Sequence, residues 1–301
     1  MTAETLRLSD GRRVRWWEGG DPEGLPVLFS HGCPDTRRAA WSGAEAARHQ
    51  GVRLIAANRP GYAGSDVHAS DHLTVAGDLA EIAALLGLDR FAVLGMSVGG
   101  GYALACAARH PDRVVAAAVV AAPADVPRLD PPLPRDGMTP EDVALIARLA
   151  EVSVDEGVEL VRPDFETWLA RLTIDDTDEA LAARWRAGLD PRDARLLDPM
   201  TDGEVAASIR EAVSDPRGYL RDAAVAFRRW ELPGDAVQCP TQLWYGAHDR
   251  QTAVRNGEWL AAHLPRATLH LNQDTAHLGT LLTQWDAILR ELGSAARSSL
   301  G

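Results

Sequence analysis

Ser97 stands in a sequence setting that could support nucleophilic chemistry. The motif Gly95-Met96-Ser97-Val98-Gly99 follows the apolar run Phe91–Leu94 and precedes an alanine-rich stretch. Glycines tolerate the strained backbone that a sharp strand-to-helix turn requires, and a serine in such a turn presents its hydroxyl above the sheet. A helix beginning behind it adds free N–H groups and partial positive charge. We therefore predict that Ser97 is a catalytic nucleophile, with a tight glycine turn and a solvent-facing serine as the alternative.

A serine nucleophile needs a base to take its proton and a carboxylate to orient that base. With this turn motif, the acid and then the histidine follow the serine along the chain. His277 lies in a loop pattern after the last apolar strand pattern, whereas His263 and His270 fall within a helix pattern and a strand pattern. We predict that His277 is the base and Asp249, which follows another strand pattern, is the acid. Asp125 is the reserve candidate for the acid.

Acyl transfer passes through an oxyanion, which two preorganised hydrogen-bond donors must stabilise. The backbone N–H of Val98, directly after the nucleophile, is one predicted donor. The loop FSHGCPDTR after the first buried strand should supply the other, and the N–H of Cys33 is the best candidate. The alternative for Cys33 is a small buried thiol, and we do not interpret its sulfur as a nucleophile.

The positioning elements can be predicted from the hydrophobic pattern. Short apolar runs such as 52–57 lack polar alternation, which is typical of strands buried on both faces of a parallel sheet. The segment 73–86 has apolar residues on one helical face, and Asp10-Gly11 separates the halves of a predicted β-hairpin. The sequence therefore predicts an α/β fold with a mostly parallel, doubly wound sheet formed by residues 1–125 and 234–301.

Residues 126–233 interrupt this pattern with one predicted helix after another. An insertion of this size beside an active-site edge would form a cap or lid. Its aromatic side chains could line an apolar pocket, although their helical spacing favours a role in the core of the insertion. These are Phe165, Trp168, Trp185, Phe227 and Trp230. A last helix is predicted for residues 278–292.

The composition excludes several classes of function. The chain has 301 residues, a formal net charge of −12 and no lysine, so it is a poor candidate for binding nucleic acid. It has neither a signal-peptide pattern nor an apolar run of the roughly 20 residues that a membrane span needs. Its three scattered cysteines form no metal-ligand or disulfide pattern. We expect a cytoplasmic protein that acts on a small molecule without a cofactor or metal, and a homodimer is left open.

Together, these residues resemble the α/β-hydrolase superfamily. The resemblance rests on His31-Gly32 after a strand, the segment NRPGYAGSD (58–66), the serine motif, Asp249 and His277, and it spans nearly the whole chain. It implies a triad of Ser97, Asp249 and His277 beneath a cap formed by 126–233. The segment from Gly95 to Val114 is similar to bacterial proline iminopeptidases, esterases and C–C bond hydrolases.

The resemblance has departures that concern loop shape rather than catalytic groups. Asn58 stands where aspartate is usual, Ala63 replaces a frequent glycine, and the segment before His277 lacks a common glycine. A serine nucleophile argues against the dehalogenase and epoxide hydrolase branches.

Three functions follow from these features. The first is a serine hydrolase that cleaves an ester, thioester, lactone or amide of a small molecule through an acyl-enzyme. An esterase-like substrate is our first choice, and a proline iminopeptidase-like aminopeptidase is the alternative. The second is a biosynthetic lyase or cyclase that reuses the same pocket for acid–base chemistry. The third is a ligand receptor without catalysis.

Overall fold

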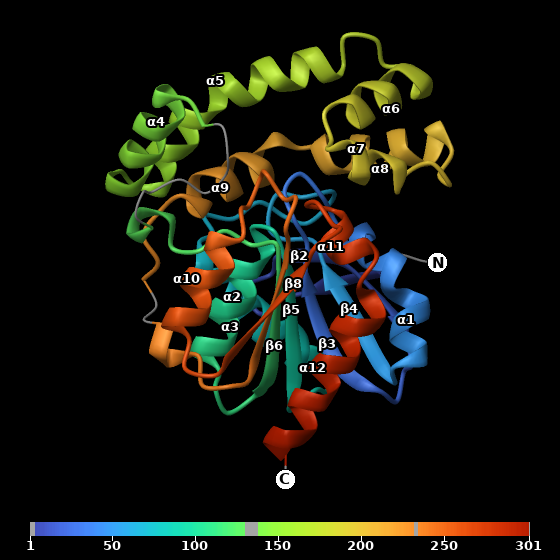
Figure 1. Cartoon of the computed structure of the whole chain (residues 1–301), viewed down its shortest axis with the longest axis vertical. Helices are drawn as coiled ribbons and strands as arrows, with labels where there is room; N and C mark the ends of the chain where they lie inside the picture. Colours follow the sequence, from blue (N-terminus) through green and yellow to red (C-terminus); the bar gives the residue numbers. More distant parts are fainter. Residues whose placement is uncertain (1–3, 130–137, 232–233, 301) are drawn as a thin grey trace.

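A single mixed sheet organises the structure, a computed structural model that describes residues 4–129, 138–231 and 234–300 (Figure 1). Its strand order is β1-β2-β4-β3-β5-β6-β7-β8. The first two pairs in this order, β1 with β2 and β2 with β4, are antiparallel, and all later pairs are parallel. The strands are β1 Glu4–Arg7, β2 Arg13–Gly20, β3 Leu25–Ser30, β4 Val52–Ala57, β5 Phe91–Met96, β6 Val114–Val120, β7 Thr241–Gly246 and β8 Ala267–Asn272.

The sequence pattern explains the central strands. Every residue of β5 and β6 is buried, as their unbroken apolar runs predict. At the antiparallel edge, β1 and β2 form the predicted hairpin, and Gly11 in its turn adopts a φ of 91° that favours glycine. No polar side chain interrupts β5 or β6, and the candidate residues Ser97, Asp249 and His277 lie in segments that follow strands.

Helices cover both faces of the sheet. One face packs against α2 (His72–Leu85), α3 (Gly99–Arg109) and α10 (Arg255–His263). The other face packs against α1 (Ala44–His49) and α12 (Trp285–Leu300). The prediction of a mostly parallel, doubly wound α/β fold is confirmed. None of the helices within the described ranges is both long enough and apolar enough to span a lipid bilayer.

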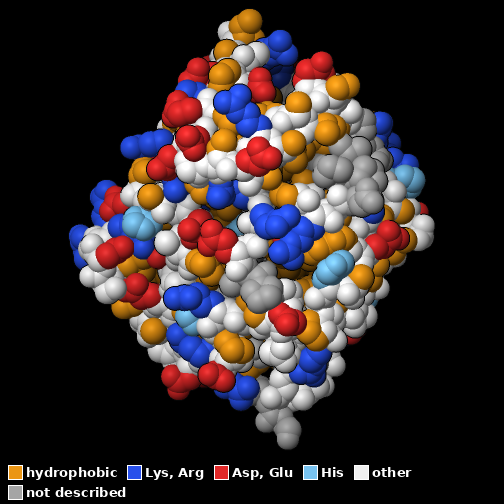
Figure 2. All heavy atoms as spheres, turned by 90° about the vertical axis from the view of Figure 1, so that its left-hand side faces the viewer, with side chains coloured by type: hydrophobic (Ala, Val, Ile, Leu, Met, Phe, Trp, Pro, Cys, Tyr) orange, Lys and Arg blue, Asp and Glu red, His pale blue; other side chains and the backbone are white. Residues whose placement is uncertain are grey.

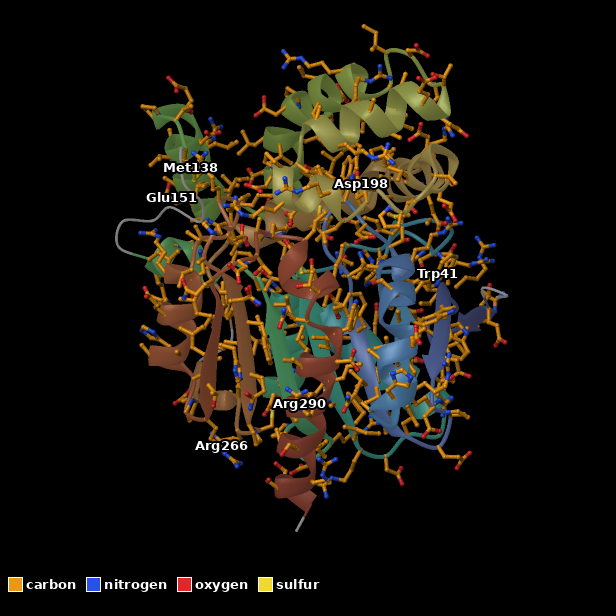
Figure 3. The ribbon with its side chains drawn as sticks, turned by 45° about the vertical axis from the view of Figure 1, so that its right-hand side comes forward. Trp41, Met138, Glu151, Asp198, Arg266 and Arg290 are labelled. Atoms are coloured by element: carbon orange, nitrogen blue, oxygen red, sulfur yellow. The ribbon has the colours of Figure 1, made fainter. Side chains whose placement is uncertain are left out.

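Between β6 and β7 the chain forms a run of helices that lies at one end of the sheet, at the top of Figure 1. Figure 3 marks this arrangement: Met138, Glu151 and Asp198 belong to this end, whereas Arg266 and Arg290 lie toward the other. Thr139, Ser153 and Thr201 begin three of the helices with capping boxes. The helices are α4 Pro140–Glu151, α5 Val154–Leu172, α6 Asp178–Ala187, α7 Pro191–Arg195, α8 Asp202–Val213 and α9 Pro216–Ala226.

We call the stretch from residue 126 to 233 the insertion. It also contains the short 3-10 helix η2 (Val126–Arg128), and the core contains η1 (Arg37–Gly43) and η3 (Gly234–Ala236). Residues 130–137 and 232–233, including the predicted carboxyl boundary of the insertion, lie outside the described residues.

Two helices differ from the prediction for identifiable reasons. The sequence predicts a helical segment around Phe165 to Leu172, but α5 starts well before it, because the helix continues through Pro163, a residue that normally ends a helix. The predicted helix 278–292 is two helices, α11 (Gly279–Leu282) and α12, separated at Thr283 and Gln284. The apolar spacing runs unchanged across this break, so periodicity alone cannot reveal it.

Candidate active site

Ser97 lies in the predicted sharp turn between β5 and α3. Its φ is +52°, in the left-handed region that disfavours a residue with a side chain. Its N–H donates a 2.8 Å hydrogen bond to the carbonyl of Val120, which anchors the turn to β6. A Cβ on Gly95 would lie 2.2 Å from the Gly99 carbonyl oxygen, and one on Gly99 would lie 2.1 Å from the Ser30 carbonyl oxygen. The backbone around Ser97 can therefore approach its neighbours only with glycine at both positions.

The next two glycines allow α3 to begin close to other segments. A Cβ on Gly100 would lie 2.4 Å from the Ala122 side chain, and one on Gly101 would lie 2.7 Å from the His72 ring. A Cβ on Gly32 would lie 3.5 Å from the Cβ of Ser97, so the loop after β3 runs beside the serine.

The side chains of Asp249 and His277 contact each other at the carboxyl end of the sheet, although 28 positions separate the two residues in the sequence. His277 Nδ1 lies 2.8 Å from Asp249 Oδ2, and both side chains are buried. The other oxygen of Asp249 accepts the N–H groups of Gln251 and Thr252, each at 2.8 Å, which fixes the carboxylate. Burial opposes a charged imidazole, but the charge and hydrogen bond of Asp249, with a further charge on Asp193, raise the pKa of His277 above 6.5.

The other candidates for the catalytic acid and base have different surroundings. Asp125 forms a 3.1 Å ion pair with Arg128. The ring of His270 stacks on Trp244 at a centroid distance of 4.1 Å, and that of His263 stacks on Trp259 at 3.8 Å. These contacts agree with structural roles for both histidines.

Two backbone N–H groups are available on the loops beside Ser97. Within the described part of the chain, neither Val98 nor Cys33 donates its backbone N–H to another residue. The Cys33 sulfur lies 3.4 Å from the Tyr62 hydroxyl oxygen. Burial, with the nearby charge of Asp222, raises the pKa of this thiol far above its usual value, so it stays protonated. This environment agrees with our interpretation that the Cys33 sulfur is not a nucleophile.

Arg59, from the segment NRPGYAGSD, holds the loop that carries Cys33. Its guanidinium donates to the backbone carbonyls of His31 and Gly32 at 2.5 and 2.9 Å. Burial and the charge of Arg59 lower the pKa of His31 well below 6.5. The neutral His31 ring accepts the Arg59 backbone N–H at 3.3 Å. Side chain and backbone of Arg59 therefore both hold this loop in place.

Asp222, on α9 of the insertion, is the buried counter-ion of Arg59. The two side chains pair at 2.5 Å and are 4% and 5% exposed. The same carboxylate accepts the hydroxyl groups of Tyr62 and Tyr102, each at 2.7 Å. A Cβ on Gly61 would lie 2.8 Å from the backbone of α9. The insertion thus packs tightly on the loop that follows β4.

Sequence reasoning missed two acidic residues that contact the catalytic loops, Asp222 and Asp193. Asp193, on α7, is fully buried and accepts the backbone N–H groups of Leu278 and Gly279, directly after His277. Both acids lie in polar helical segments and contact residues 85 or more positions away. No local signal distinguishes them from solvent-exposed helix residues.

The aromatic residues of the insertion pack mainly against one another. Phe165 is buried, and its ring centroid lies 4.5 Å from that of Tyr219 on α9. Trp168 stacks on the same tyrosine at 5.7 Å. This packing agrees with the expectation, from their helical spacing, that these aromatic side chains form the core of the insertion. The Tyr219 carbonyl lies 4.0 Å from the Cys33 sulfur, so α9 reaches the loop beside Ser97.

One groove is lined by residues of the core and of the insertion, among them His72, Gly101, Val225, Arg228 and Trp230, but not by Ser97 or His277. Acidic and basic side chains are interspersed over the face shown in Figure 2. Within the described ranges, no cluster of three or more histidine, cysteine or acidic side chains could hold a metal ion.

Comparison with known proteins finds relatives that are similar to parts of this chain. A pimeloyl-(acyl-carrier protein) methyl ester esterase from Chromobacterium violaceum is 30% identical over 202 residues, which are 65% of this chain and 66% of that protein. A proline iminopeptidase from Neisseria gonorrhoeae is 30% identical over 116 residues, 36% of each chain. The matches therefore span less than two thirds of these relatives' own lengths.

Solved structures show the same fold at low sequence identity. An esterase from Exiguobacterium antarcticum superimposes with a TM-score of 0.70 at 19% identity, covering 98% of this chain and all of that one. An enol-lactonase from Burkholderia xenovorans superimposes with a TM-score of 0.68 at 16% identity, and the alignment has the same coverage. The sequence model of the alpha/beta hydrolase fold matches residues 26–282. Because this match spans most of the chain, the protein belongs to the α/β-hydrolase fold family.

Proposed function

We propose that this protein is a serine hydrolase that cleaves an ester bond of a small molecule through Ser97, His277 and Asp249. The buried hydrogen bond between His277 and Asp249, formed at the same sheet edge as the strained Ser97 turn, is the observation that carries the proposal. Because the carboxylate accepts from Nδ1, that nitrogen bears the proton, and Nε2 is left as the base.

In the proposed reaction, His277 Nε2 takes the proton of the Ser97 hydroxyl as its oxygen attacks the substrate carbonyl carbon. The oxyanion that forms accepts hydrogen bonds from the N–H groups of Val98 and Cys33. His277 then gives its proton to the departing alcohol, which leaves Ser97 acylated. Water, deprotonated by His277, attacks the acyl carbon and releases the carboxylic acid and free Ser97.

We further propose that the insertion, residues 126–233, acts as a cap over a core of residues 1–125 and 234–301. Its position at the end of the sheet that carries the site, and the contact of α9 with the Cys33 loop, support this role. A cap of this kind would exclude water from the acylated serine and shape the substrate pocket.

An aminopeptidase that acts on an N-terminal proline is the second candidate. The Neisseria relative supports it, as does Asp35, which lies two residues beyond Cys33. Burial raises the pKa of Asp35 to about 6, yet the carboxyl group would still be mainly ionised above that pH. An anionic side chain in this loop could pair with the amino group of a peptide substrate.

Labelling with a fluorophosphonate probe, read by intact mass, tests the proposal. We expect one adduct on the wild-type protein and none on Ser97→Ala. A wild-type protein without an adduct, or a labelled Ser97→Ala variant, would contradict the activated serine. Turnover of p-nitrophenyl esters and of prolyl amides then separates the two candidates, and loss of prolyl amide hydrolysis in Asp35→Asn would support the aminopeptidase. Turnover of neither substrate by a labelled protein would favour a lyase or cyclase.

A further inference from the structure

The insertion places a fully buried carboxylate against the loop that carries His277. Asp193, on α7, has an exposed fraction of 0%. Its Oδ2 accepts the N–H of Leu278 at 2.9 Å, and its Oδ1 accepts the N–H of Gly279 at 2.8 Å. A carboxylate that receives two backbone N–H groups in this way fixes both in direction and position.

These two N–H groups belong to the residues that directly follow the proposed base. A Cβ on Gly279 would lie 3.3 Å from Asp193 Oδ1 and 3.4 Å from the Thr275 side chain, so Gly279 lies close to both residues. No side chain of the loop itself caps α11. Asp193 therefore supplies the acceptor for the first N–H groups of this segment, which the loop's own side chains do not supply.

We propose that Asp193 is a positioning residue for catalysis, which holds the backbone after His277 and adds negative charge beside its imidazole. This inference rests on the proposed function, because it concerns how His277 acts on Ser97. Through Asp193, the insertion would contribute to the transfer of the proton from Ser97 to His277, in addition to covering the site.

The charge of Asp193 should matter because the imidazole becomes a cation when it takes the Ser97 proton. Asp249 and Asp193 are the charged groups that face His277, and both stabilise its protonated form. Loss of the Asp193 charge should therefore lower the pKa of His277. Loss of its two hydrogen bonds should allow the base to move, and a displacement of about 1 Å can reduce a rate by about 100-fold.

The rate of fluorophosphonate labelling of Ser97, measured from pH 5 to 9, tests this inference without a known substrate. In Asp193→Asn, we expect the plateau rate to fall by about 10- to 100-fold and the inflection to move to lower pH. Asp190→Asn is the matched control, because Asp190 begins the same helix and asparagine retains its capping bond to the N–H of Arg192. Its labelling rate and inflection should equal those of the wild type.

The outcomes separate this inference from the proposed function. If wild-type Ser97 is not labelled, the proposed function fails. If it is labelled and folded Asp193→Asn has an unchanged plateau and inflection, the positioning role is wrong while the proposed function stands. A lower plateau with an unchanged inflection would also overturn the electrostatic part of the role.

A second variant covers the case in which Asp193→Asn does not fold. Asp193→Glu keeps the charge but moves the carboxylate by one methylene group. We expect a lower plateau with the inflection retained, and a wild-type plateau in this variant would overturn the inference.

Discussion

Replacement of Asp222 by alanine should destabilise the whole fold, because it leaves a buried cation without its partner. Arg59 and Asp222 are 4% and 5% exposed, so water cannot replace the lost carboxylate without opening the site. Tyr62 and Tyr102 would lose the acceptor of their hydroxyl groups in the same step. The carbonyls of His31 and Gly32 would remain as acceptors for the guanidinium and would offset part of the loss.

The size of the effect follows from these contacts. Removal of one partner of a buried ion pair costs about 3–5 kcal/mol, and a buried hydroxyl without a partner costs about 1–3 kcal/mol. The two costs arise within one cluster of side chains and are therefore not additive. We expect the free energy of unfolding to fall by about 3–5 kcal/mol for Asp222→Ala. A typical domain is stable by only about 5–15 kcal/mol, so the loss should be large.

Urea unfolding, followed by circular dichroism and tryptophan fluorescence, measures this change. Asp155→Ala is the control, since Asp155 is 80% exposed and pairs with Arg221 on the same helix as Asp222. That variant should lose less than about 1 kcal/mol. The double variant Arg59→Met with Asp222→Leu removes both charges and should be more stable than Asp222→Ala. A loss below about 1 kcal/mol in Asp222→Ala would refute the role of this pair as a buried, mutually dependent contact.

Three further predictions concern the site and its loops. Because His277 must be neutral to take the Ser97 proton and its pKa is raised, the labelling rate should fall as the pH drops through a value above 6.5; a flat profile from pH 5 to 9 would contradict this. Gly99→Ala should abolish labelling and cost about 1–3 kcal/mol in urea unfolding, since its Cβ would lie 2.1 Å from the Ser30 carbonyl. Ala63→Gly should raise stability by about 0.5–1 kcal/mol, because Ala63 has a φ of +35°; an unchanged urea midpoint would show that this strain is absent.

The sequence predicts the core of this fold well because local and global signals agree there. The strand 52–57 coincides with β4, since its residues other than Arg53 are apolar and buried in the sheet. The glycines around Ser97 indicate a turn because few other residues tolerate such close backbone contacts. The pairing of His277 with Asp249 follows from the chain order of nucleophile, acid and base that accompanies such a turn.

The contacts between the insertion and the core could not be predicted in this way. Asp193 and Asp222 each lie in a helix whose sequence is compatible with solvent exposure. Their burial depends on how α7 and α9 are oriented over the sheet, and helical periodicity carries no information on that orientation. The departure at Ala63 was visible in the sequence, but only the structure shows that the loop keeps a left-handed backbone there.

These buried contacts also constrain how a substrate reaches Ser97. Three consecutive helices of the insertion each contribute one acidic side chain to the core: Asp193 from α7, Glu211 from α8 and Asp222 from α9. A hinge motion that lifted all three helices would break the ion pairs of Glu211 and Asp222 and the two backbone hydrogen bonds of Asp193, at a total cost of several kcal/mol. Such an open state would be populated far below 1%. If the insertion is the proposed cap, we expect α7 to α9 to stay in place on the core when a substrate enters.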